Sequence, residues 1–133
     1  MDQTQVRAST ALIINPEGLV LAVSRKDDPN DFGLPGGKCE VGDQDPIQTA
    51  IREVEEETGV VLDRDSMQLV YVDMARTQVC ACYRATDYED SQLRSREAGV
   101  VKWVDYEELL KGSFKDYNRR LLRMVFRTLR NPL

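Results

Sequence analysis

The sequence predicts an α/β fold in which helical layers cover both faces of a mixed β-sheet. Short runs rich in β-branched and aliphatic residues recur along the chain, one amphipathic helical segment interrupts them at residues 46–58, and two helical segments close the chain. Strands that are interrupted by one helix and followed by terminal helices favour a mixed sheet between helices. Because 41% of the 133 residues are hydrophobic, we expect a single domain over residues 1–133 with its own core.

Two segments with the composition of strands stand at the start of the chain, residues 6–14 and 19–24. The residues between them, 15–18, read Asn-Pro-Glu-Gly and are typical of a turn, so we expect the two strands to form a hairpin. The polar residues 26–32 that follow are predicted to form a loop.

Local signals define both ends of the central helix. Asp45 is a good N-cap residue, and Pro46 suits the first helical position because its fixed φ is helical. Gly59 suits a left-handed C-cap. We therefore expect a helix over residues 46–58.

The second half of the chain is predicted to add strands and then helices. We expect strands at residues 68–74, 78–85 and 100–104. Residues 88–99 are charged and read as irregular. Asp105 can cap a short helix that extends to residue 111, and a longer helix follows over residues 115–130.

Three carboxylates of the central helix fall on one edge of it. At about 100° per residue, Glu53, Glu56 and Glu57 share an arc of roughly 100°. A separate side of the helix is apolar and holds Ile47, Ile51 and Val54. Like charges at these spacings repel each other, and a divalent cation would remove that penalty. Carboxylate ligands in a chain without His favour Mg²⁺ or Mn²⁺. The alternative is a solvated acidic helix face.

The loop before this helix favours the metal over the solvated face. Pro35 fixes its own φ, whereas Gly36 and Gly37 are free to adopt positive φ, so the backbone N–H groups of this loop can approach an anion closely. Lys38 follows directly and can contact a phosphate. A phosphate-binding loop next to clustered carboxylates predicts a site for a metal ion and a phosphate ester or anhydride.

Residues 37–60 resemble the signature of the Nudix hydrolases. That signature has a Gly, then a Glu, then an Arg-Glu-apolar-any-Glu-Glu-any-Gly-apolar run, and here the run is Arg-Glu-Val-Glu-Glu-Glu-Thr-Gly-Val from Arg52 to Val60, with Gly37 as the leading Gly. The chain departs from the pattern at two points. Asp43 stands where the family has Glu, and one extra residue, which we place near Gln44, precedes Arg52.

The resemblance implies an α/β/α sandwich and a Nudix-type pyrophosphohydrolase. Such an enzyme uses Mg²⁺ or Mn²⁺ to hydrolyse a phosphoanhydride bond in a nucleoside triphosphate or another nucleoside diphosphate derivative. The metal ligands would be Glu53, Glu56 and Glu57, and Arg52 would orient these carboxylates rather than contact substrate. The general base is open between Glu53 and Glu97. Glu89 and Asp90 are further candidates for the base.

Further residues are candidates for substrate contacts. Arg25 and Lys38 could bind phosphate groups, together with the backbone of Gly36 and Gly37. Phe32 either packs under the loop or stacks on a base. Relatives that act on ADP-ribose or dinucleoside polyphosphates often have Pro or Tyr where this chain has Ala-Arg-Thr-Gln at residues 75–78, which favours a nucleoside triphosphate or another small nucleotide as substrate.

A stripe of arginines on the last predicted helix is the second charged feature. Seven Lys or Arg residues and one Asp follow residue 110, although the whole chain has a net charge of −5. Five of the arginines fall in an arc of roughly 100°, namely Arg119, Arg120, Arg123, Arg127 and Arg130. They form a solvated face paired with acidic neighbours, a contact with nucleic acid, or a subunit contact in a homodimer.

An alternative function of a different class keeps the fold without catalysis. Asp43 and the extra residue near Gln44 are compatible with a protein that only binds nucleotide or RNA. The chain has no signal peptide and no apolar run of about 20 residues that could span a bilayer, so we expect a cytoplasmic protein without a membrane partner. Of its three cysteines, Cys80 and Cys82 would point to the same face of a strand and are expected to be buried thiols, whereas Cys39 lies beside the predicted phosphate loop.

Overall fold

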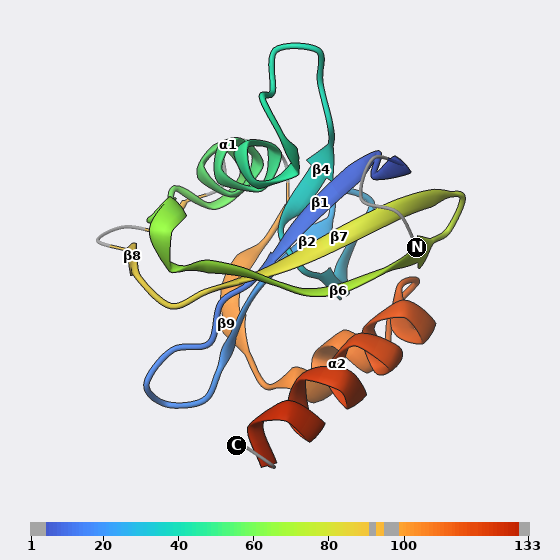
Figure 1. Cartoon of the computed structure of the whole chain (residues 1–133). Coiled ribbons are helices and arrows are strands. Elements are labelled where there is room, and N and C mark those ends of the chain that lie inside the picture. Colours follow the sequence, from blue (N-terminus) through green and yellow to red (C-terminus); the bar gives the residue numbers. More distant parts are fainter. Residues whose placement is uncertain (1–4, 91–92, 95–98, 131–133) are drawn as a thin grey trace.

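The computed structural model describes residues 5–90, 93–94 and 99–130, and a mixed four-stranded sheet lies at its centre (Figure 1). The strand order of this sheet is β4-β1-β7-β6, with bounds Gly36–Lys38, Ala8–Leu12, Gln78–Ala85 and Met67–Ala75. Strands β1 and β7 run parallel, whereas β1 with β4 and β6 with β7 run antiparallel.

Two smaller sheets complete the strands. An antiparallel sheet of order β3-β2-β9 is formed by Asp28–Gly33, Val20–Arg25 and Val101–Val104. A pair of two-residue strands joins β5 (Val61–Leu62) to β8 (Tyr88–Glu89). The 3₁₀ helices η2 and η3 span Arg64–Ser66 and Tyr106–Leu110.

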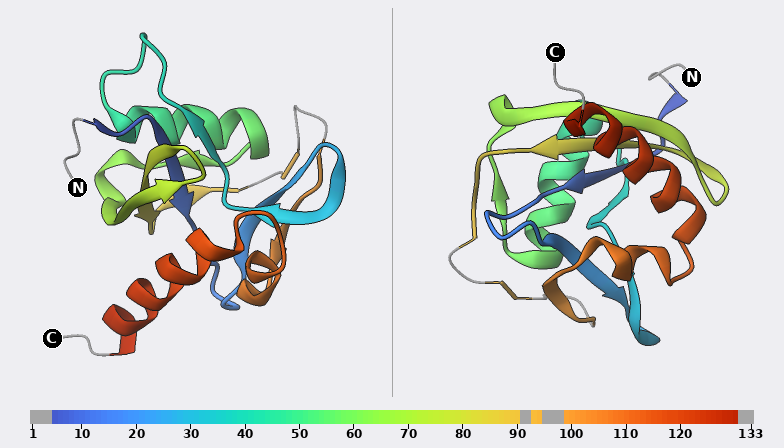
Figure 2. Two further views of the ribbon diagram at one scale, coloured as in Figure 1. Left: turned by 90° about the vertical axis from the view of Figure 1, so that its right-hand side faces the viewer. Right: turned by 90° about the horizontal axis from the view of Figure 1, so that it is seen from below.

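The α-helices α1 (Pro46–Thr58) and α2 (Lys115–Arg130) lie on opposite sides of the strands (Figures 1 and 2). Successive residues of a strand point to opposite faces of the sheet, so the apolar side chains divide between the α1 side and the α2 side. In β1, Ala11 packs into the core under α1, whereas Leu12 packs into the core under α2. Cys80 and Cys82 of β7 share the α2 side, both buried as predicted. The predicted α/β/α sandwich with a mixed sheet is confirmed.

The predicted bounds of the central helix are confirmed, because local caps determine them. The Asp45 carboxylate accepts a hydrogen bond from the Gln48 N–H at 2.8 Å, and Pro46 occupies the first turn. Gly59 adopts the left-handed conformation, with φ of 82°, and donates its N–H to the Glu55 carbonyl at 2.9 Å. These caps determine where α1 begins and ends.

The structure corrects two predictions for the first half of the chain. The two strands of the predicted hairpin pair only next to the turn, through an antiparallel bridge between Ile14 and Val20. Beyond that bridge β1 and β2 belong to different sheets. Residues 26–32, predicted as a loop, contain most of β3. Although β3 is polar, it forms an edge of its sheet by pairing with β2, and edge strands tolerate polar side chains.

The second half agrees more closely with the sequence. Strand β7 and helix α2 have the predicted bounds, β6 extends one residue beyond its predicted bounds at each end, and β9 begins one residue later than predicted. The short helix that Asp105 caps is a 3₁₀ helix, in which the Asp105 carboxylate accepts from the Glu107 N–H at 3.1 Å. Among the described residues, no helix is both long and apolar enough to cross a membrane.

Candidate active site

Arg52 stands at the centre of a network that joins the acidic edge of α1 to the loop before it. Its Nη1 donates to Glu53 Oε1 at 2.8 Å and to Glu56 Oε2 at 3.5 Å. Its Nη2 donates to the backbone carbonyl of Lys38 in β4 at 3.3 Å. The guanidinium group therefore holds two carboxylates of the helix against the strand that carries the glycines.

The other side of the Arg52 guanidinium is held by Asp43. Arg52 Nε donates to Asp43 Oδ1 at 3.0 Å and Nη2 donates to Oδ2 at 2.9 Å, which is a bidentate pair. Asp43 also accepts from the Thr49 hydroxyl at 2.8 Å and from the Glu40 N–H at 2.9 Å, and its side chain is 6% exposed. These bonds, with Arg52 first, hold the pKa of Asp43 well below its usual value. The shorter side chain of Asp43 thus reaches Arg52.

Gly36 and Gly37 let β4 approach both its neighbours closely. A Cβ on Gly37 would lie 2.5 Å from the Glu53 carboxyl carbon, and a Cβ on Gly36 would lie 2.1 Å from the Ser9 carbonyl oxygen. A larger residue at Gly36 would meet the backbone of β1, and a larger residue at Gly37 would displace the Glu53 carboxylate. The Gly36 N–H also donates to Glu57 Oε1 at 3.4 Å. Two of the three predicted metal ligands therefore border the two glycines directly.

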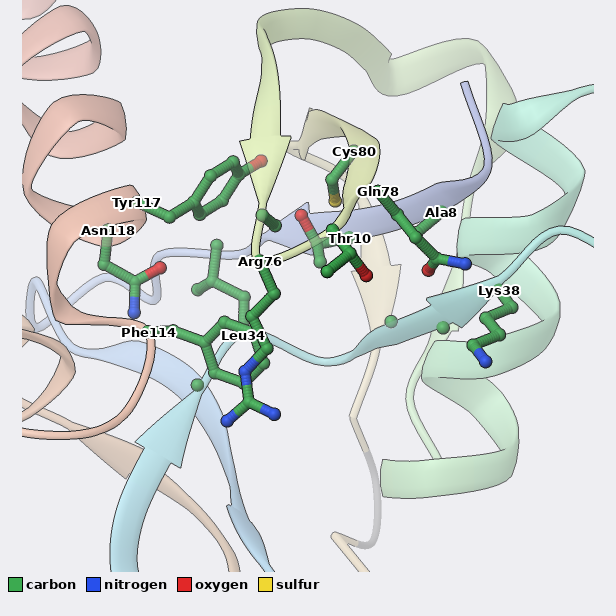
Figure 3. Close-up of a pocket in the computed structure, with 15 residues that line it drawn as sticks. Ala8, Thr10, Leu34, Lys38, Arg76, Gln78, Cys80, Phe114, Tyr117 and Asn118 are labelled. Carbon is green, nitrogen blue, oxygen red and sulfur yellow. The ribbon is translucent and has the colours of Figure 1, made fainter. Parts of the chain in front are cut away.

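A cavity of about 380 Å³ opens on the other face of the same glycines (Figure 3). It lies between β4, the turn that joins β6 to β7, and the start of α2. Its lining includes Gly36, Gly37, Lys38, Arg76, Phe114 and Tyr117. Neither Lys38 nor Arg76 forms an ion pair with a residue that the structure describes. The lining thus combines apolar, aromatic and uncharged polar side chains with two cations, Lys38 and Arg76.

Comparison of the sequence with known proteins shows the family to which the chain belongs. The NUDIX domain family matches residues 4–125 of the chain. A MutT-like protein from Streptomyces ambofaciens is 31% identical over 111 residues, which are 84% of this chain and 71% of that protein. The chain belongs to the Nudix family. The predicted enzyme class, a Nudix-type pyrophosphohydrolase, is confirmed with it.

Solved Nudix structures agree in fold over nearly the whole chain. The MutT Nudix hydrolase from Burkholderia pseudomallei is 27% identical, with a TM-score of 0.69 over 91% of this chain and 98% of that one. The Nudix domain of Shewanella oneidensis NrtR, solved in complex with ADP ribose, is 23% identical, with a TM-score of 0.71 over 94% of this chain and 88% of that one.

Nudix hydrolases generally use a divalent metal ion, and the donor set on α1 fits one. Its oxygens are all carboxylate oxygens, which hard cations prefer. Within the described part of the chain, no three acidic, His or Cys side chains converge in a ready metal cage. The reason is visible in the network, because Glu53 and Glu56 direct oxygens at Arg52. Glu53 and Glu57 already border β4 at the two glycines.

The remaining predicted site residues are dispersed. Phe32 is 3% exposed and belongs to the core under α2, so its position supports packing rather than stacking on a base. Arg25 pairs with Asp27 at 3.0 Å and does not line the cavity. Glu97 lies outside the described residues. Glu89 and Asp90 are exposed at β8.

The arginines of the stripe on α2 have different surroundings. Arg120 donates to Asp73 Oδ2 at 2.8 Å and to the Met74 carbonyl at 3.1 Å, so it ties α2 to β6. Arg119, Arg123 and Arg127 are exposed and line a groove between α2 and η3. The side chain of Arg130 lies outside the described part. For Arg120, the predicted pairing with acidic neighbours is observed.

The cavity walls were not predicted from the sequence, because they come from four segments that are distant along the chain. The strongest local feature is Arg76, which is the single non-glycine residue with positive φ among those described, at 58°. It sits in the two-residue turn between the paired residues Ala75 and Gln78. Its guanidinium carbon lies 4.6 Å from the centre of the Phe114 ring, which holds it over the cavity. The turn is strained at a residue that lines the site.

Comparing two substitutions at Arg76 measures this strain. Arg76→Gly and Arg76→Ala both remove the contact with Phe114, but only Gly tolerates positive φ. We expect the free energy of unfolding of the Gly variant to exceed that of the Ala variant by about 1 kcal/mol. Urea unfolding followed by circular dichroism checks this, and equal stability of the two variants would mean that the turn is unstrained.

Proposed function

We propose that this Nudix protein hydrolyses a phosphoanhydride bond in a nucleoside triphosphate or another nucleoside diphosphate derivative, with Mg²⁺ or Mn²⁺ as its cofactor. The observation that carries the proposal is that Gly36 and Gly37 border both the carboxylates of α1 and the cavity. A ligand whose base enters the cavity would direct its phosphates along β4 toward Glu53 and Glu57. The cavity is also large enough for a nucleoside.

The residues around β4 have separate roles in this proposal. Glu53, Glu56 and Glu57 would hold the divalent ion, which neutralises phosphate oxygens and lowers the pKa of a water molecule when it is bound. Arg52 orients Glu53 and Glu56, and Asp43 fixes Arg52 in turn. Lys38 contacts the phosphate chain. The general base, Glu53 or Glu97, takes a proton from a water molecule. The water oxygen bonds to a phosphorus atom and the P–O bond of the anhydride breaks, which gives two phosphorylated products.

A screen of nucleotides in the presence of Mg²⁺ tests the proposal. Nucleoside triphosphates, ADP-ribose and dinucleoside polyphosphates are incubated with the protein, and the products are separated by anion-exchange chromatography. We expect at least one nucleotide to yield two phosphorylated products with Mg²⁺ or Mn²⁺ and none to react in excess EDTA. Turnover that survives EDTA would contradict the metal, and absence of turnover on every nucleotide would contradict the hydrolysis.

A second candidate function is nucleotide binding without catalysis. It is favoured by Asp43 in the place of the family's Glu and by Glu53 and Glu56 being engaged with Arg52. The same screen separates the two functions, because a protein of this kind would bind a nucleotide tightly in a calorimeter and leave it intact. The homodimer and the cytoplasmic location stay predictions.

A further inference from the structure

A cationic groove lies outside the candidate active site, where the 3₁₀ helix η3 packs beside α2 (Figure 2). The groove has a volume of about 560 Å³, and none of the described residues that line it is acidic. Three arginines line it from α2, and its other lining residues are apolar or aromatic: Arg119, Arg123 and Arg127, with Tyr106, Leu110, Leu122 and Phe126. The groove therefore concentrates positive charge in a chain whose net charge is −5.

The protein itself neutralises these three arginines only weakly. Arg119 lies 3.9 Å from Asp116, and both side chains are at least half exposed, so this pair contributes little. Arg123 and Arg127 form no ion pair with any residue that the structure describes. The positive charge of the groove thus remains available to an anionic ligand.

The spacing of the arginines fits the backbone of a single nucleic-acid strand. Arg119, Arg123 and Arg127 follow one another at intervals of four residues, so they lie on one ridge of α2 with a rise of about 6 Å between neighbours. This rise is close to the distance between successive phosphates of an extended strand. Three consecutive phosphates can therefore each meet one guanidinium group.

Tyr106 adds a surface on which a base can stack. The residue is 37% exposed, and its ring packs edge to face against Phe126 with the ring centres 5.0 Å apart. This contact holds the Tyr106 ring on the η3 side of the groove, while the arginines come from α2. Aromatic rings beside a row of cations are the combination by which proteins bind single strands without reading their sequence.

Two other anionic partners fit the groove less well. An anionic membrane would require an apolar helix face that can insert, but the apolar face of α2 is packed in the core, where Leu121 and Val125 are buried. An acidic protein segment offers a carboxylate only where its sequence provides one, whereas a nucleic-acid strand offers a phosphate at every unit.

We propose that this groove binds a single strand of nucleic acid, through phosphate contacts with Arg119, Arg123 and Arg127 and through a base stacked on Tyr106. The inference does not depend on the proposed hydrolysis, because the groove shares no lining residue with the cavity beside β4. Because the rest of the chain is acidic, binding is confined to a short stretch of the strand.

Fluorescence anisotropy with short labelled strands of oligouridylate and oligothymidylate tests the proposal. The strands carry no terminal phosphate, and EDTA is present, so that neither a phosphoanhydride nor a metal ion takes part. The test variant is Arg123→Gln with Arg127→Gln. Its matched control is Lys26→Gln with Lys115→Gln, which changes the net charge equally at two exposed residues outside the groove.

Wild-type protein is expected to bind both strands. The arginine double variant should bind at least about tenfold more weakly at low salt, and its plot of log affinity against log salt should lose about 1.4 in slope, since each phosphate contact of a single strand contributes about 0.7. The lysine double variant should keep the wild-type affinity and slope.

Two changes at Tyr106 test the stacking contact separately. Tyr106→Leu should weaken binding by about fivefold or more without changing the salt slope, because it removes a ring and no charge. Tyr106→Phe keeps the ring and should bind as wild type does. Melting temperatures of all variants show whether each one is folded.

Several results would overturn the inference, whatever the nucleotide screen finds. Absence of binding of both strands to wild-type protein is one, and equal losses in the arginine and lysine double variants are another. Tighter binding of polyglutamate than of oligouridylate would assign the groove to an acidic protein instead. Equal affinity of folded Tyr106→Leu and wild type, or a duplex bound as tightly as the single strand, would contradict the stacked base.

Discussion

Glu56→Gln and Glu57→Gln are each expected to lower turnover of the best substrate by about 100-fold or more, because each removes a charged oxygen ligand of the divalent ion. The fold should survive, since Glu56 is exposed on the edge of α1 and its Arg52 contact is long, at 3.5 Å. Relief of repulsion between like charges should leave the metal-free Gln variants as stable as wild type or slightly more stable. Steady-state kinetics and thermal melts check both statements.

Glu55→Gln is the matched control for this prediction. It makes the same change of charge on the same helix, but Glu55 is predicted to point away from the acidic edge and its side chain is not among the Arg52 contacts. We expect the Glu55 variant to keep at least half of the wild-type rate. Wild-type rates in both Glu56→Gln and Glu57→Gln would show that the metal ligands are elsewhere.

Asp43→Asn is expected to lower the free energy of unfolding by roughly 1.5–3 kcal/mol and to reduce turnover as well. The change removes the charge from a bidentate pair with Arg52 whose carboxylate is 6% exposed, and charged hydrogen bonds of this kind contribute about that much. Arg52 would then be held mainly by its bonds to Glu53, Glu56 and the Lys38 carbonyl, so the two carboxylates would be positioned less firmly. Urea unfolding and steady-state kinetics on the same samples test the two effects.

The pH dependence of this loss has a definite sign. Arg52 and the other donors hold the pKa of Asp43 below its value in the unfolded chain, so the stabilisation is complete above the unfolded pKa and is lost as pH falls toward the folded one. The difference between wild type and Asp43→Asn should therefore be constant from about pH 5 upward and shrink below about pH 4.

Asp45→Asn provides the contrast for Asp43→Asn. Asp45 also pairs with an arginine, Arg64, but both side chains are more than one third exposed and Asn is an equally good N-cap. We expect a loss of no more than about 1 kcal/mol for this exposed pair. If Asp43→Asn costs no more than Asp45→Asn, the Arg52 network does not hold the site together.

Features determined by neighbouring residues could be predicted from the sequence. The bounds of α1 follow from Asp45, Pro46 and Gly59, each of which acts within one turn of the helix. Its acidic edge follows from helical periodicity, and the same argument predicted α2. The Nudix signature lies within this local part of the chain, which is why the family could be predicted from residues 37–60.

Features that depend on distant pairing could not be predicted in the same way. Strand β3 is polar and exists because β2 pairs with it, so composition indicated a loop. The contact of Asp43 with Arg52 depends on the backbone position of Asp43 next to Thr49 and Arg52, which its residue type does not reveal. The cavity joins β1, β4, the turn at Arg76 and α2, and no periodicity connects these segments.

Binding of Mn²⁺, measured by electron paramagnetic resonance, tests most directly whether the acidic edge of α1 holds the catalytic ion. Free Mn²⁺ gives a sharp signal that is lost on binding, so titration yields the number of sites and their affinity. Wild-type protein and Glu55→Gln are expected to bind Mn²⁺ alike, whereas Glu56→Gln and Glu57→Gln should bind it at least about tenfold more weakly. Equal binding by all four proteins, or no binding by wild-type protein even with nucleotide present, would contradict the account.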